Sequence, residues 1–282
     1  MEYTKKMPNS FLQEQFDIEI ANFKNDVENL SVGNYTKSYE TYKRISNIIR
    51  YFKKEIENKK GIMKIVDIGC GNGYYIFMLN LLLKLKDKAH FYGVDISQTE
   101  VQFAKASKKS LGMDNVTFDV CDAENIILPD ESFDIVICCE LIEHLAHPEN
   151  CLEGIKRILK PGGAAIITTP NKYNPILRFS HMFNFLVKYK EKDFSHKIKE
   201  DSRLGAEHIS VKGLNEWIKI VKAVGFKVEG IRRGSLIAGG HRYNAHPVIC
   251  SAILILDRIL DCLPFTHNIT ENITFKLRKP KV

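Results

Sequence analysis

Three residues near the middle of the chain have side chains that can move protons or bind a metal ion. Glu140, Glu143 and His144, in the stretch CELIEHL, follow an apolar run and stand at i, i+3 and i+4. If a helix begins there, all three side chains lie on one side of it. Two carboxylates and an imidazole at that spacing can bind a divalent cation, act as a general base, or merely favour a helix start.

Short apolar segments alternate with amphipathic segments on both sides of this cluster. The alternation is typical of an α/β fold, in which helices cover both faces of a mostly parallel sheet. The expected strands are 63–69, 90–96, 115–121, 133–139, 164–170, 226–233 and 272–280. The expected helices are 74–85, 98–110, 148–160, 213–225 and 248–262.

The N-terminal region differs from the rest of the chain. Apolar side chains recur at helical spacing over residues 10–57, so we expect residues 1–60 to form a helical N-terminal segment or lid. Residues 61–282 are then one domain, with an insertion after the fifth strand at about 171–212. The KPGG turn, at 160–163, is expected to end the helix before that strand.

Composition excludes several classes of protein. The chain has 282 residues, of which 44% are apolar, and a net charge of only +7. Its densest basic stretch, 188–203, is interleaved with acids. This charge pattern disfavours a nucleic-acid partner. Its seven cysteines form no C-x-x-C pair, so we expect a reducing, cytoplasmic location. No secretory signal opens the sequence, and the longest apolar run, 248–256, is shorter than the ~20 residues of a membrane span. The expected helix 248–262 suits either burial in the core or peripheral contact with a membrane surface.

A glycine-rich segment, IVDIGCGNGYY, follows the first expected strand and opens a helix. Gly69, Gly71 and Gly73 allow a tight turn and a close approach of the backbone to a ligand. The G-x-G-x-G spacing departs from the G-x-G-x-x-G spacing of dinucleotide sites. Asp67, two residues before the first glycine, suits an ammonium group and would repel a pyrophosphate.

Acidic residues also follow the next two strands. Asp95, after the second strand, could accept hydrogen bonds from both hydroxyls of a ribose. Asp122 follows the third strand and could accept from an adenine amino group, while the small Ala123 leaves room for the ring. The glycine turn and the two acids, in this order, therefore predict a nucleoside site.

The motifs DIGCGNG, VDIS, CDAENI, FDIVICCELIEHL and LKPGG together resemble those of the class I S-adenosylmethionine-dependent methyltransferases, over about residues 60–170. The chain looks most similar to small-molecule O-methyltransferases of the ubiquinone-pathway type. The resemblance implies a Rossmann-like, doubly wound sheet of seven strands with an antiparallel last strand, and S-adenosylmethionine as cofactor. The implied cofactor contacts are Asp67, Gly69, Cys70, Gly71, Tyr74, Asp95, Ile96, Asp122, Ala123, Cys139 and Glu140.

The resemblance gives the first cluster two functional interpretations beside the structural one. His144 can be the general base for a substrate hydroxyl, with His208 as a second candidate catalytic residue. Alternatively, Glu140, Glu143, His144 and His208 bind a divalent cation such as Mg²⁺ or Zn²⁺, since E-x-x-E-H with a later histidine resembles small-RNA 2′-O-methyltransferases. In the structural interpretation, Glu143 favours a helix start and His144 packs against its neighbours.

The acceptor is expected to be a small molecule methylated on a hydroxyl oxygen. After the fourth expected strand, the sequence lacks the N/D-P-P-Y/F tetrapeptide of amino-methylating nucleic-acid enzymes and the Pro-Cys pair of cytosine C5 methylation. A metal-assisted RNA 2′-O-methyltransferase and a cofactor-binding module without turnover remain the alternatives. Expected rim residues of the acceptor pocket are His241, Arg242, Tyr243 and His246, and Tyr39, Tyr42 and Arg44 precede the first strand as further candidate contacts. No feature of the sequence sets an oligomeric state.

Overall fold

The computed structural model describes residues 39–57, 59–173, 208–235 and 269–281, together with 255, 259, 260, 263 and 266. The expected pocket rim at 241–246 and most of the expected insertion and of helix 248–262 lie outside these residues. The same holds for the expected helical region before residue 39. In the described part of the chain, no helix combines the length and the apolarity that crossing a bilayer requires.

A single seven-stranded sheet forms the centre of the molecule, with the strand order β3-β2-β1-β4-β5-β7-β6. Strands β1 to β5 are parallel, and β7 is antiparallel to both of its neighbours, β5 and β6. This arrangement confirms the predicted Rossmann-like fold with an antiparallel last strand. The strands are β1 (Met63–Ile68), β2 (Ala89–Asp95), β3 (Val116–Val120), β4 (Phe133–Cys139), β5 (Leu159–Pro170), β6 (Lys227–Arg233) and β7 (Asn272–Arg278).

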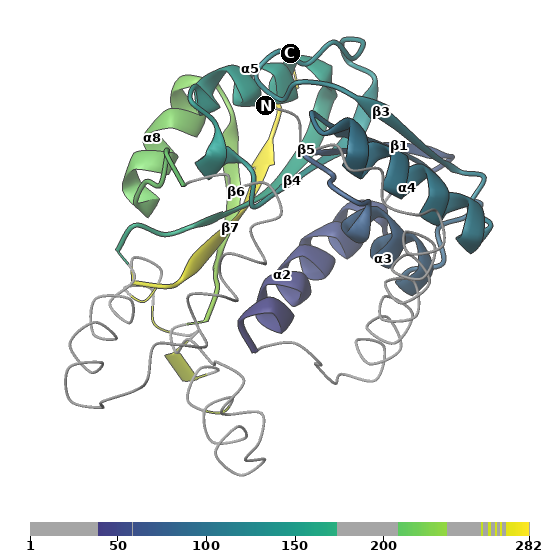
Figure 1. The fold of residues 1–282 in the computed structure, drawn as a ribbon. Coiled ribbons are helices and arrows are strands. Elements are labelled where there is room, and N and C mark those ends of the chain that lie inside the picture. Colours follow the sequence, from purple (N-terminus) through teal and green to yellow (C-terminus); the bar gives the residue numbers. More distant parts are fainter. Residues whose placement is uncertain are drawn as a thin grey trace, which may run out of the picture.

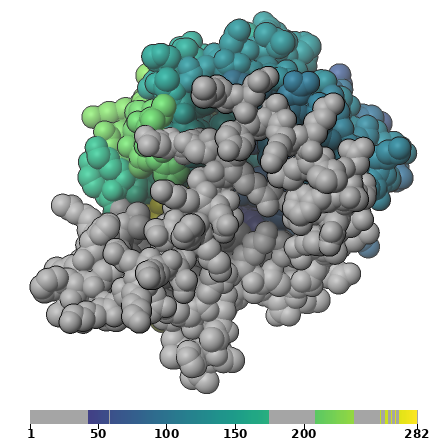
Figure 2. Space-filling view, viewed as in Figure 1, coloured from purple at the N-terminus to yellow at the C-terminus, as the bar shows by residue number. Residues whose placement is uncertain are grey.

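Helices cover both faces of the sheet (Figure 1), because the apolar strands present buried side chains to both sides. Helices α2, α3 and α4 pack on one face, and α5 and α8 pack on the other. The space-filling view shows the described residues as one continuous body from α8 in green to α4 in blue (Figure 2). The helices are α2 (Tyr39–Ile56), α3 (Tyr74–Leu82), α4 (Gln98–Leu111), α5 (Pro148–Ile158) and α8 (Leu214–Ala223), with a 3-10 turn η1 (Ile142–His144).

Helix α2 carries an apolar stripe and a polar stripe, and both meet the sheet. Ile45, Ile48 and Phe52 are buried in the core formed with β1 and β4. In its last turn, Glu55 is only 8% exposed and pairs with two cations of β7. The four charged groups of this network, named here the Glu55 network, are Glu55, Glu229, Lys276 and Arg278.

One predicted boundary is wrong, because the KPGG residues pair with a segment that is distant in the sequence. Helix α5 ends at Ile158, and the KPGG residues belong to β5, whose pairing with β4 shifts register between Phe133 and Ile135. Gly162, at φ +73°, donates its N–H to Lys279 O at 3.0 Å, so these residues extend the sheet and do not form a free turn. The CELIEHL stretch forms the short turn η1, and the helix after it begins at Pro148, as predicted.

Candidate active site

The glycine-rich turn after β1 lies at the carboxyl edge of the sheet, where open α/β folds bind ligands. Gly69, Gly71 and Gly73 all have positive φ, at +72°, +50° and +85°. A side chain at Gly69 would meet Leu141 Cδ2 at 2.7 Å, whereas one at Gly71 would have its nearest neighbour 4.0 Å away. The turn therefore packs against the protein at Gly69, whereas at Gly71 the described residues leave space that a ligand could occupy.

Asp67, the acid at the end of β1, has the surroundings of a cation site. Its side chain is 1% exposed, and neither carboxylate oxygen has a hydrogen-bond partner among the described residues. Burial raises the pKa of this carboxyl well above its ordinary value, and the charge of Asp95 raises it further. A buried carboxylate without a partner costs free energy, so a bound ammonium group would offset that cost. The residue thus fits the amino group that the sequence assigned to it.

The acids after β2 and β3 border one end of this turn. Asp95 accepts hydrogen bonds from the N–H groups of Gly71, at 2.8 Å, and Ser97, at 2.9 Å, which ties the β1 and β2 loops together. Each carboxylate oxygen retains a lone pair for a ribose hydroxyl. Asp122 is exposed and accepts from the N–H of Glu124 at 2.9 Å.

Two apolar residues complete that end of the site. Ile96 is a large apolar side chain that is 69% exposed beside Asp95, and Ala123 is buried beside Asp122. An exposed isoleucine directly after Asp95 fits an adenosine, which needs an apolar surface for its ring and acceptors for its hydroxyls. The side chain of Cys70 packs toward β2, since an added Cβ on Gly93 would lie 2.9 Å from its sulfur. The side chain of Cys70 is buried.

Glu140, directly after β4, has a strained backbone and a fixed side chain. Its φ is +51°, a left-handed conformation that non-glycine residues seldom adopt. Its N–H donates to the carbonyl oxygen of Thr168 at 3.0 Å and to Thr168 Oγ1 at 3.1 Å. The Thr168 hydroxyl donates to Glu140 Oε1 at 2.7 Å, and Arg44 Nη1 of α2 donates to Glu140 Oε2 at 3.0 Å. Glu140 is thus directed at α2 and β5, and not along a shared helical face with Glu143.

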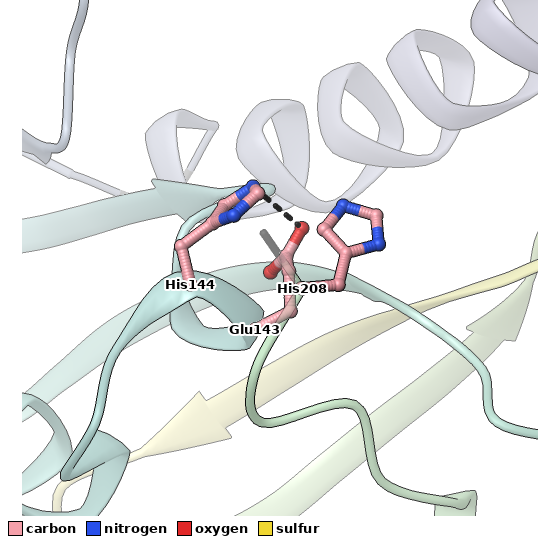
Figure 3. A group of neighbouring side chains, drawn as sticks. All are labelled: Glu143, His144 and His208. Atoms are coloured by element: carbon pink, nitrogen blue, oxygen red, sulfur yellow. Dashed lines mark ion pairs between the residues drawn. The ribbon is translucent and has the colours of Figure 1, made fainter. Parts of the chain in front are cut away.

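Glu143, His144 and His208 come together in one cluster (Figure 3), in which one ligand atom from each lies within 4.8 Å of the others. Glu143 and His144 belong to η1, and His208 precedes α8. The N–H of Ser210 donates to Glu143 O at 2.8 Å, which holds the His208 segment against η1. The imidazole rings of His144 and His208 have their centroids 4.7 Å apart.

The charges in this cluster are unusual. Glu143 is 1% exposed, and its carboxylate has no hydrogen-bond partner among the described residues, although Oε1 lies 4.0 Å from His144 Nε2. Burial raises the pKa of Glu143 to about 8, and the negative charge of Glu140 contributes. Burial and the neighbouring His144 lower the pKa of His208. A buried acid between two imidazoles can orient a base or bind a cation. Glu140, the fourth predicted metal ligand, is not part of this group.

The sequence did not single out two residues of this edge. Tyr75, in the first turn of α3, lies within the electrostatic reach of Arg44, Glu140 and Asp67, and burial raises the pKa of its phenol. The predicted Tyr74 packs edge-to-face against it, with ring centroids 5.6 Å apart. The second such residue is Thr168, and the TTP ending of β5 is the one sequence feature that could have indicated it.

Comparisons with known proteins agree with this geometry. A family model described as a methyltransferase domain matches residues 59–225, which is more than half of the chain. A tRNA U34 carboxymethyltransferase of Desulfotalea psychrophila is 33% identical over 117 residues, 42% of this chain and 35% of that protein. A ubiquinone biosynthesis O-methyltransferase of Coxiella burnetii is 28% identical over 145 residues, 50% of this chain and 58% of that protein. The chain thus spans less than two thirds of the length of these curated relatives.

Solved structures share the fold. A phosphoethanolamine N-methyltransferase 2 of Haemonchus contortus, in complex with S-adenosyl-L-methionine, matches with a TM-score of 0.53 at 18% identity, over 83% of this chain and 53% of that one. The strand order, the glycine turn with its acids and the family match lead to one assignment. The chain belongs to the class I S-adenosylmethionine-dependent methyltransferases.

Proposed function

We propose that this methyltransferase acts on a hydroxyl oxygen of a small-molecule acceptor, with His144 as the general base. The observation that supports this best is the cluster of Glu143, His144 and His208 directly after β4. Histidine is the side chain best suited to accept a proton at neutral pH. The name of the ubiquinone-pathway relative, an O-methyltransferase, supports oxygen as the acceptor atom.

Each residue would have a distinct task in this reaction. S-adenosylmethionine, when bound, supplies an electrophilic methyl group on its sulfonium. Asp67 would hold the ammonium group, and Asp95 the ribose, so that the methyl group is aligned with the acceptor oxygen. His144 would accept the hydroxyl proton, and the side chain of Glu143, whose Oε1 lies 4.0 Å from His144 Nε2, would orient the imidazole.

The test compares two histidines that lie close in sequence. His144→Asn should lower kcat by about 10²-fold or more, the usual contribution of a general base, while the Kd of S-adenosylhomocysteine stays unchanged. His147→Asn is the matched control, because His147 is exposed and precedes α5. Turnover is followed as S-adenosylhomocysteine released with a panel of phenols, catechols and sugars. An undiminished kcat in His144→Asn would contradict the assignment.

A divalent cation in the same cluster is the second proposal. One carboxylate and two imidazoles within 4.8 Å are a donor set that suits Zn²⁺ or Mn²⁺ better than Mg²⁺, which prefers oxygen ligands. The burial of Glu143 without a hydrogen-bond partner among the described residues also fits a ligand that supplies positive charge. A cation there would lower the pKa of a coordinated acceptor hydroxyl.

Direct binding separates the cation from the general base. The full-length protein, treated with EDTA and dialysed, is titrated with Zn²⁺, Mn²⁺ or Mg²⁺ and followed by calorimetry and thermal melting. The proposal predicts a one-to-one stoichiometry and a rise in Tm, both lost in His208→Asn and kept in His147→Asn. Unchanged turnover after EDTA, without any calorimetric signal, would exclude the metal.

RNA is the rival acceptor, and one relative gives it specific support because its name describes a tRNA-modifying enzyme. A protein that neutralises RNA phosphates binds more weakly as salt rises. Retardation of tRNA at low salt that disappears at high salt would favour RNA. Absence of any retardation at low salt would leave the small-molecule acceptor.

The cellular location is a proposal of the same kind. Cys70, Cys121, Cys138, Cys139 and Cys151 are free and buried among the described residues. Free cysteines are usual where thiols are kept reduced. They support a cytoplasmic location, which fractionation of cells that express the protein would test.

A further inference from the structure

An ion pair joins the N-terminal helix to the residue that follows β4. Arg44 Nη1 lies 3.0 Å from Glu140 Oε2, although the two residues are 96 positions apart in the sequence. Both side chains are largely buried, with 18% and 26% exposure. Glu140 also holds a left-handed backbone conformation at φ +51° and makes three hydrogen bonds with Thr168. Strained residues of this kind persist where the surrounding contacts hold them, and they occur often at functional sites.

The topology of the sheet places this pair at one end of the cofactor. The strand order reverses between β1 and β4, and ligands of open α/β sheets bind in the crevice at that point. The ribose and adenine groups belong over β2 and β3, where Asp95 and Asp122 lie. The amino acid and sulfonium end is therefore directed toward β1 and β4. Asp67, Glu140 and Arg44 lie at this edge close enough to Tyr75 for the charges of all three to influence its pKa.

A carboxylate beside a sulfonium has a cost for catalysis. The sulfur carries a full positive charge in the reactant and loses it as the S–C bond breaks and the O–C bond forms. A bare carboxylate at this place would stabilise the reactant more than the transition state, and an interaction of that kind slows the chemical step. A neighbouring guanidinium offsets the negative charge, so the reactant is no longer stabilised more than the transition state, while the carboxylate stays in position.

We infer that Arg44 is a positioning residue of the methyl-transfer site, which holds Glu140 against Thr168 and cancels its charge beside the sulfonium. Helix α2 is then a part of the active site and not only a cover for the sheet. The inference rests on the proposed contact between the cofactor and the β4 end. It does not depend on which acceptor is methylated.

Binding of two forms of the cofactor tests the inference without any acceptor. S-adenosylmethionine carries the sulfonium charge and S-adenosylhomocysteine does not, so the ratio of their Kd values reports the field at the sulfur. Arg44→Gln should shift the ratio toward S-adenosylmethionine by about threefold or more, the scale of one screened charge several ångströms away. Glu140→Gln should shift it by a similar factor in the opposite direction, and the double variant should return close to the wild-type ratio.

Kinetics and conservative variants separate positioning from folding. Arg44→Gln should lower kcat and the KM for S-adenosylmethionine together, as expected when an interaction with the reactant has been strengthened. Arg44→Lys should restore most of kcat because it keeps the charge. Arg50→Gln, an exposed arginine of the same helix, is the matched control and should change neither quantity.

Opposite outcomes overturn the inference. If Arg44→Gln weakens both compounds equally, the arginine has a structural role only. If Arg44→Gln does not fold, Glu140→Gln alone decides, and an unchanged Kd ratio in that isosteric variant would refute the charge argument. Failure of the hydroxyl proposal would be seen separately: hydroxyl acceptors would give no turnover, while the ratio of the two cofactor Kd values would still change in the variants as predicted.

Discussion

Two groups of buried acids lie on one sheet and differ in their partners. Glu55, on α2, is bound by Lys276 at 2.5 Å and by Arg278 at 2.7 Å, and Arg278 also binds Glu229 at 2.6 Å. Asp67 and Glu143, at the carboxyl edge of the sheet, are buried at least as deeply and have no hydrogen-bond partner among the described residues.

The opposite pKa shifts follow from this difference in partners. Burial alone would raise the pKa of every buried acid, but hydrogen bonds to Arg278 and Lys276 lower that of Glu55 below its ordinary value. Without such cations, burial raises the pKa of Asp67 and Glu143. Paired acids thus stabilise the fold, whereas unpaired acids keep the capacity to bind a ligand at the expense of stability.

The largest effect is expected at Asp67. Asp67→Asn should weaken S-adenosylmethionine binding by about 10- to 100-fold, because a charge-assisted hydrogen bond to the ammonium group is lost. The same change should raise Tm, since it removes a buried carboxylate that has no partner in the described fold. Calorimetry and thermal melting measure the two quantities. A variant that binds normally and melts lower would show that Asp67 is a structural acid.

The Glu55 network should respond in the opposite way. Glu55→Gln leaves Lys276 and Arg278 without their buried partner and should cost about 3 kcal/mol in the free energy of unfolding. Cofactor affinity of the folded variant should not change. Urea unfolding and calorimetry provide the measurements, with Glu57→Gln, an exposed residue directly after α2, as control. Weaker cofactor binding without loss of stability would contradict the separation of the two regions.

The smallest effect should depend on pH. The hydrogen bond to Arg278 lowers the pKa of Glu229 to about 2, so the ionised form is favoured in the folded protein. Its contribution is therefore present above about pH 4.5, the ordinary value, and is lost as the pH falls toward 2. Because the pair is partly exposed, Glu229→Gln should cost at most about 1 kcal/mol at pH 7. Unfolding curves of both proteins should converge at low pH, and a constant difference would exclude the ion pair as its cause.

Local patterns made the glycine turn and the acids at the strand ends predictable. The positive φ of Gly69 and Gly71 follows from a tight turn after an apolar strand, and the acids at the ends of β2 and β3 follow from strand periodicity. The proximity of His208 to His144 was also anticipated, although from a motif resemblance and not from periodicity.

Contacts that depend on tertiary structure could not be predicted in the same way. The helical spacing at Glu140 suggested a shared face, but Thr168 and Arg44, which come from distant elements, fix that residue in a left-handed conformation. The KPGG residues look like a turn because their hydrogen-bond partner, Lys279, lies far away in the sequence. Pairing across more than a hundred residues leaves no local pattern.

The position of β7 constrains the order in which the chain can assemble. Strand β6 pairs only with β7 in the described sheet, yet β7 begins at Asn272, 39 positions after β6 ends at Arg233. During synthesis, β6 therefore cannot join the sheet until residues 272–278 have left the ribosome. These residues then form β7, which inserts between β5 and β6. Pairing between residues so distant in the sequence is slow, so we expect insertion of β7 to be the last step of folding. The same step brings Lys276 and Arg278 to Glu55 and thereby holds α2 against the sheet beside the active site.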